Sequence, residues 1–155
     1  MASAYDWESG EGLLGIDDPA EWDAAFERGA DHLGTAVIGL ALNCSLEDAS
    51  PRIVRAIRLP DRRQRAYAFT AMAHVARLHG ELTPELYAVL LAEGPVGTAG
   101  DTIDDALHFV PFRDLPPWLR RRWVLVRVRN RLEGWWLRSA DAVGGAWRAL
   151  RRRRS

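Results

Sequence analysis

Signals that begin and end helices recur at short intervals along this chain. Asp18, Pro19 and Glu21 supply an N-cap, a proline at the first helical position and an acid three residues after the cap. Further start signals are Ser50-Pro51, Asp61 with Gln64, Thr83-Pro84 and Pro116-Pro117, and stop signals are Asn43, Pro60, Gly80, Gly94 and Pro111. The sequence therefore predicts helices near 19–29, 31–42, 50–58, 61–79, 84–92, 99–109 and 117 to about 150.

One segment also carries a strand signal, because Val124, Val126 and Val128 alternate with arginines. A helical periodicity explains the apolar positions from residue 117 to about 150 better than a strand does, although Gly134, Gly144 and Gly145 lower the helix propensity of this segment. At about 100° per residue, one face collects Trp118, Leu125, Val128, Leu132, Trp136, Val143, Ala146 and Leu150. The predicted fold class is all-α.

Segment 66–78 is small and apolar almost all round, which predicts a helix flanked on both sides by others. Short helices in pairs are typical of a HEAT-like α-solenoid, here with about three hairpins at 31–58, 61–92 and 99 to about 140. The expected organisation is a loosely ordered acidic arm over 1–17, HEAT-like repeats over 18–115, and a Trp- and Arg-rich helix with a basic tail over 116–155. That last helix is expected to cap the stack, with Trp118, Leu125, Leu132 and Trp136 packed on the hairpins.

A resemblance supports this prediction. It is carried by Ala41-Leu42-Asn43, Pro51-Arg52-Ile53-Val54, Arg65-Ala66, the run 71–82 (Ala-Met-Ala-His-Val-Ala-Arg-Leu-His-Gly-Glu-Leu), Asp104-Asp105-Ala106-Leu107 and Phe109. Over residues 31–110 the chain resembles small bacterial HEAT-repeat proteins often encoded beside polymorphic toxins. The resemblance implies an immunity protein that binds and blocks a cognate toxin. The match ends at Pro111, so the C-terminal helix lies outside it.

Charge is distributed unevenly, although 21 basic residues balance 21 acidic ones. Residues 1–50 carry a net charge of −10 and residues 111–155 a net charge of +10, and every basic residue is arginine. These two ends can pair within one chain, pair between chains, or present a basic surface to an acidic partner. A lone cysteine and the lack of a signal sequence or spanning segment predict a cytoplasmic protein.

Candidate chemical groups are few. His74 lies among apolar residues, which favours a core histidine over a metal ligand. Asp101, Asp104, Asp105 and His108 are close in sequence, but acids near a helix start are favoured by the helix dipole alone. Cys44 has no neighbouring base, and no nucleophile or phosphate-binding motif occurs. We expect no catalytic residue, no cofactor and no metal, and therefore no enzyme.

The predicted working surface is instead a charged face that binds another protein, such as a toxin encoded nearby. Its expected residues are Arg52, Arg55, Arg58, Glu85, Arg120, Arg127, Arg131 and Arg138. The arginines at 52 and 55 are expected to be exposed, so that their reversal leaves the fold intact. An alternative is that the basic C-terminal helix binds nucleic acid or an anionic membrane surface. The simpler structural interpretation is that its tryptophans complete the core and its arginines are solvated.

Overall fold

The computed structural model describes residues 5–152, with side chains at 5–133, 135 and 136. Over these residues the chain is helical throughout its regular structure and contains no strand, which confirms the all-α prediction. The elements are η1 (Leu13–Gly15), α1 (Pro19–Glu27), α2 (Leu33–Asn43), α3 (Leu46–Ala56), α4 (Arg62–His79), α5 (Pro84–Glu93), α6 (Gly97–Phe109), η2 (Phe112–Asp114) and α7 (Pro117–Arg152).

Three predicted caps are confirmed by their hydrogen bonds. The side chains of Asp18, Asp61 and Thr83 accept from backbone N–H groups at the starts of α1, α4 and α5. The start of α3 is different, since Ser45, whose Oγ accepts from the Asp48 N–H at 3.1 Å, caps the helix. The prediction that Ser50-Pro51 begins this helix is wrong: Pro51 lies inside it, because the stronger cap stands earlier in the chain.

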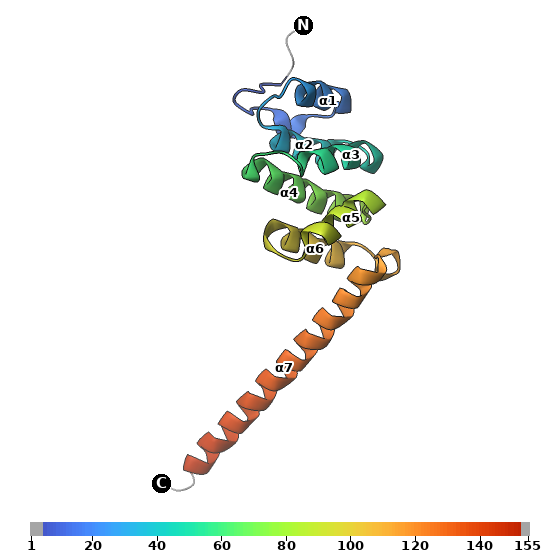
Figure 1. The fold of residues 1–155 in the computed structure, drawn as a ribbon. Helices are drawn as coiled ribbons and strands as arrows, with labels where there is room; N and C mark the ends of the chain where they lie inside the picture. The colour runs from blue at the N-terminus through green and yellow to red at the C-terminus, as the bar shows by residue number, and fades with distance from the viewer. Residues whose placement is uncertain (1–4, 153–155) are drawn as a thin grey trace. The chain divides into compact units, whose positions relative to one another are not determined.

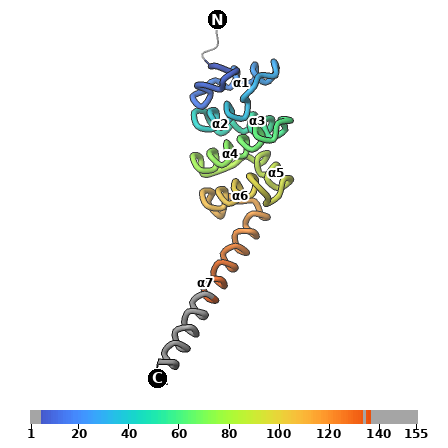
Figure 2. The backbone as a smooth tube through the Cα atoms, turned by 90° about the vertical axis from the view of Figure 1, so that its left-hand side faces the viewer, coloured from blue at the N-terminus to red at the C-terminus, as the bar shows by residue number. Residues whose placement is uncertain are grey.

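The chain divides into two compact units, Met1–Leu115 and Pro116–Ser155. In the first unit α2, α4 and α6 lie side by side in one row, as Figures 1 and 2 show. Helices α3 and α5 form a second row against the first, and α1 packs on α2 and α3. The position of α4 between α2 and α6 confirms that segment 66–78 is flanked on both sides.

Two close contacts hold the first row together. At Gly34 the backbone of α2 comes so near α4 that a Cβ would lie 2.3 Å from the Gln64 carbonyl oxygen. The Gly34 N–H donates to Gln64 Oε1 at 2.7 Å. Between α4 and α6, the buried Thr102 hydroxyl donates to the Phe69 carbonyl at 3.0 Å. The fully buried large side chains of the helices in this unit include Trp22, Val37, Leu40, Ile53, Met72, Leu86, Leu90 and Ile103.

The segment before α1 is packed, which differs from the loosely ordered arm expected over 1–17. Leu13 and Ile16 are fully buried, and η1 contacts α2. Asn43 Nδ2 donates to the carbonyls of Leu14 and Ile16 at 3.0 and 3.3 Å. The acidic composition of this segment predicted little packing, but the burial of Leu13 and Ile16 holds it on α2. Burial depends on individual side chains and not on the average hydropathy of a segment. Residues 1–4 lie outside the described part of the arm.

The second unit is α7. It is helical over residues 124–131, where valines alternate with arginines, which confirms the prediction of a helix in place of a strand. On its apolar stripe, Leu125, Leu132 and Trp136 are 69%, 61% and 68% exposed. That this stripe packs on the hairpins of the first unit stays a prediction. Helical periodicity identifies an apolar face but not what covers it. Val143, Ala146 and Leu150, expected on the same face, lie outside the described side chains.

Candidate binding surfaces

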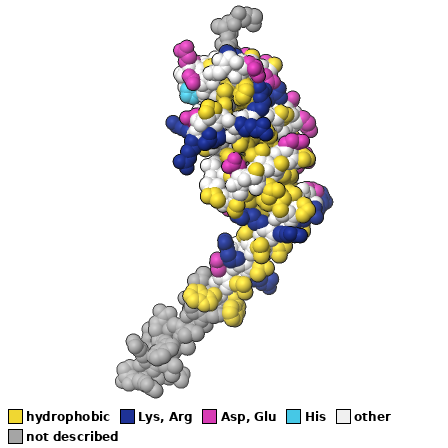
Figure 3. Space-filling view, viewed as in Figure 1, with side chains coloured by type: hydrophobic (Ala, Val, Ile, Leu, Met, Phe, Trp, Pro, Cys, Tyr) yellow, Lys and Arg dark blue, Asp and Glu magenta, His cyan; other side chains and the backbone are white. Residues whose placement is uncertain are grey.

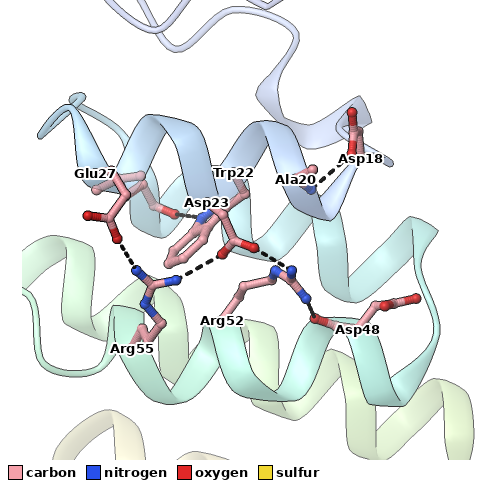
Figure 4. A network of polar contacts seen from close by, with 9 residues as sticks. Asp18, Ala20, Trp22, Asp23, Glu27, Asp48, Arg52 and Arg55 are labelled. Carbon is pink, nitrogen blue, oxygen red and sulfur yellow. Dashed lines mark hydrogen bonds and ion pairs between the residues drawn. The ribbon is translucent and has the colours of Figure 1, made fainter.

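Two of the predicted partner-binding residues contribute to a cluster of ion pairs between α1 and α3 (Figure 4). Arg55 donates to Asp23 Oδ1 at 2.9 Å and to Glu27 Oε1 at 2.8 Å. Arg52 pairs with the other oxygen of Asp23 and donates to the Asp48 carbonyl at 2.7 Å. We call Asp23, Glu27, Arg52 and Arg55 the α1–α3 cluster. Its two arginines hold α1 on α3.

Two aromatic rings also contact Arg55 of this cluster. The guanidinium carbon of Arg55 lies 4.0 Å from the ring centroid of Phe26 and 5.5 Å from that of Trp22. Arg52 is only 18% exposed at its side chain. The expectation that both arginines are exposed is therefore wrong, because both are half-buried and paired with acids of α1. Their partners lie about thirty positions earlier in sequence, so spacing within α3 alone does not reveal them.

Removal of Arg55 tests the structural role of the cluster. We expect Arg55→Ala to lower the free energy of unfolding by about 1–2 kcal/mol, because two partly exposed ion pairs and a cation–π contact are lost. A double-mutant cycle with Asp23→Ala is expected to give a coupling energy of about 0.2–1 kcal/mol in urea denaturation. The control is Arg58→Ala, which changes an exposed arginine beyond the helix. Equal losses in Arg55→Ala and Arg58→Ala would contradict this role.

The other predicted partner-binding residues are exposed where the structure describes them. Arg58 follows α3, and Glu85 lies in the first turn of α5. Arg120, Arg127 and Arg131 are exposed on α7, with the Arg127 guanidinium 4.2 Å from the Trp123 ring centroid. Arg138 lies outside the described side chains. The structure thus brings Arg52 and Arg55, among the predicted residues, together with carboxylates of another helix.

The outward side of the first row forms a surface that the sequence did not predict. Residues spaced by three, four or seven positions on α2, α4 and α6 are half-buried or exposed, while their neighbours toward α3 and α5 are buried. Because such spacing marks one side of a helix, these residues share the outward side of the row. We call this surface the row face, and it comprises Thr35, Ile38, Leu42, Thr70, His74, Arg77, Asp101, Asp104 and His108.

The row face changes in chemistry from helix to helix. On α2 it is uncharged, on α4 it carries Arg77 and His74, and on α6 it carries acids. Arg77 approaches Asp105 of α6 at 3.8 Å and lies 5.0 Å from the Phe109 ring centroid. Burial, and then the nearby Arg77 cation, lower the pKa of His74 below its ordinary value, so the neutral imidazole is favoured.

The residues considered for metal or thiol chemistry have other surroundings. Among the described residues, Asp101, Asp104, Asp105 and His108 do not form a group that could hold a metal ion. The His108 ring instead meets Phe109 edge to face, with centroids 4.7 Å apart. Cys44 donates from Sγ to the Asp17 carbonyl at 3.4 Å, and burial raises the pKa of its thiol. A raised pKa disfavours the thiolate that a nucleophile requires.

A groove of about 540 Å³ lies between the α1–α2 and α3–α4 connections. Phe26, His32, Asp61 and Gln64 contribute to its lining. Several of its polar groups already stabilise the fold: Gln64 accepts from Gly34, Asp61 caps α4, and His32 Nε2 lies 3.2 Å from the Glu8 carbonyl. The row face, whose side chains are turned outward, is therefore the stronger candidate for contact with another molecule.

Comparisons of this chain with protein-family models, with curated proteins and with solved structures found no match. Within the described residues, no helix has both the length and the hydropathy needed to cross a bilayer.

Proposed function

We propose that the first unit is a short HEAT-like solenoid that works in the cytoplasm by binding another protein, without catalysing a reaction. The observation that supports this most directly is the row face, where three adjacent helices present uncharged, basic and acidic side chains in turn. Such ordered rows suit a broad partner, because complementary charges orient it during association. Inhibition of a toxin is the specific form that the resemblance over residues 31–110 suggests.

The dimensions of the row face agree with this role. Helices packed about 8–10 Å apart, each about 16–27 Å long, give a projected area of roughly 500 Å² for three helices. A standard interface buries about 800 Å² of accessible surface on each partner. Since accessible area exceeds projected area on a corrugated surface, the row face is large enough to contribute most of one side of such an interface.

The experiment is co-expression of this chain with the product of a neighbouring toxin-like gene. We expect the two to co-purify at near one-to-one ratio and the cells to survive the toxin. The variant Leu42→Asp with Asp101→Arg changes two exposed positions of the row face and should weaken the complex at least tenfold. The matched control, Glu93→Arg, reverses an exposed acid at the end of α5 in the second row and should leave binding unchanged.

Two results would contradict this proposal. One is that no neighbouring toxin is bound or neutralised. The other is that Glu93→Arg weakens the complex as much as the row-face variant, which would assign the contact to the second row. Circular dichroism of each variant separates loss of binding from loss of fold.

A further inference from the structure

The apolar stripe of α7 is the largest exposed apolar feature among the described side chains. Six large apolar residues on this helix are between 46% and 69% exposed: Val124, Leu125, Val128, Leu132, Trp135 and Trp136. At about 100° per residue they occupy an arc of roughly 120°. Figure 3 shows apolar side chains following one another along the described part of α7, with arginines beside them. Contiguous apolar surface of this kind marks a site of interaction.

Arginines border this stripe on both sides. Arg120, Arg127 and Arg131 fall within roughly 40° of one another on one margin, and Arg129 lies on the other. Arg127 covers the Trp123 ring, which keeps its guanidinium beside the helix. Glu133 pairs with Arg129 at 3.5 Å on the side away from the three clustered arginines. Over residues 124–136, the helix surface is therefore apolar along the centre of the stripe and cationic along each margin.

The charge of the whole segment restricts what can cover the stripe. Residues 116–155 hold twelve arginines and two acids, a net charge of +10. Two copies of this helix would repel each other, so the stripe is not expected to be covered by the α7 helix of a second chain. Nucleic acid would use the arginines but leave the valines, leucines and tryptophans in water, because its affinity comes from phosphate contacts.

We infer that α7 binds an anionic lipid surface, lying in the plane of the headgroups. Helices that do so have Trp and Leu on one face, arginine on the polar face and low mean hydropathy. The stripe would be buried where the headgroups meet the acyl chains, with the tryptophans at the level of the headgroups. The arginines at its margins would contact lipid phosphates. The helix runs for 36 residues, which suits an extended plane of headgroups better than a single protein groove.

This inference is independent of the proposed function, because its residues lie on α7 and those of the row face lie in the first unit. It is tested with the full chain and vesicles of phosphatidylcholine, with or without phosphatidylglycerol. We expect at least tenfold stronger binding to the anionic vesicles in a co-flotation assay, and a steep loss of binding as salt is raised. Equal binding to both kinds of vesicle, or binding to neither, would overturn the inference.

Paired variants separate the stripe from the margin. Leu132→Gln removes an apolar side chain from the stripe and should weaken vesicle binding about tenfold. Its control is Leu91→Gln, at a similarly exposed leucine of α5, which should have no effect. Arg131→Gln should weaken binding about fivefold, whereas Arg58→Gln, with the same loss of charge in the first unit, should not.

Two outcomes would assign the stripe elsewhere and overturn the inference. A large fall in melting temperature for Leu132→Gln but not for Leu91→Gln would mean that the stripe is covered within the chain. Binding of duplex DNA that depends on Arg131 but not on Leu132, together with vesicle binding indifferent to Leu132, would assign α7 to nucleic acid.

Discussion

Trp22→Ala is expected to lower the free energy of unfolding by about 3–5 kcal/mol, the largest effect of any single substitution considered for this chain. The Trp22 ring is fully buried and stacks on Phe26 with centroids 5.3 Å apart. Its Nε1–H donates to the Leu33 carbonyl at 3.1 Å, at the first residue of α2. Truncation would leave a cavity between α1 and its neighbours and remove a hydrogen bond to α2. Urea denaturation followed by circular dichroism measures the loss.

Trp22→Phe separates the two contributions. It keeps most of the ring but removes the hydrogen bond, so we expect a smaller loss, about 1–2 kcal/mol. The Arg55 guanidinium, which lies over the Trp22 ring, keeps its contact with Phe26 in both variants. A loss below about 1 kcal/mol for Trp22→Ala would contradict the burial of this side chain.

Gly34→Ala is expected to cost about 1–3 kcal/mol, because it forces two helices of the first row apart. The added Cβ would lie 2.3 Å from the Gln64 carbonyl oxygen and 2.8 Å from its Cα. Both are backbone atoms and move only with α4 itself. The hydrogen bond from the Gly34 N–H to Gln64 Oε1 would also be strained. The shift in urea midpoint gives the size of the effect.

Gly39→Ala is the matched control within the same helix. Both substitutions gain about the same helix propensity, since each replaces glycine by alanine in α2. The new Cβ at position 39 would meet the Leu13 carbonyl at 2.3 Å and Ile16 Cγ2 at 2.7 Å. Relief of this clash displaces the short N-terminal segment and does not separate α2 from α4, so Gly39→Ala should cost about 1 kcal/mol less. Equal losses would contradict this difference between the two contacts.

The helices of this protein were predictable because their signals are local. Asp18, Asp61 and Thr83 satisfy backbone donors two or three positions later, and that geometry is present in the sequence itself. The start of α3 was placed at Ser50-Pro51, whereas the helix is capped by Ser45 and contains Pro51. A proline is compatible with a helix start, but the serine side chain is what satisfies the exposed N–H groups.

The candidate surfaces were less predictable, because they depend on residues distant in sequence. Arg52 and Arg55 have the spacing of an exposed charged face, and only the packing of α1 on α3 reveals their partners. The row face was missed for the converse reason: its residues are unremarkable on each helix and become a surface only when α2, α4 and α6 lie together. The helical and amphipathic character of α7 was predicted, because it follows from the spacing of residues within one segment.

The N-terminal segment that covers α2 also restricts how identical chains can assemble. Leu13 and Ile16 occupy the side of α2 that faces away from α4, where an additional helix of the row would otherwise lie. Head-to-tail association that repeats without closing produces filaments, and it requires both ends of such a row to be open. Because this segment belongs to the same chain, it occupies the α2 end of the row in every copy of the protein. We therefore expect that a second copy does not extend the row at the α2 end.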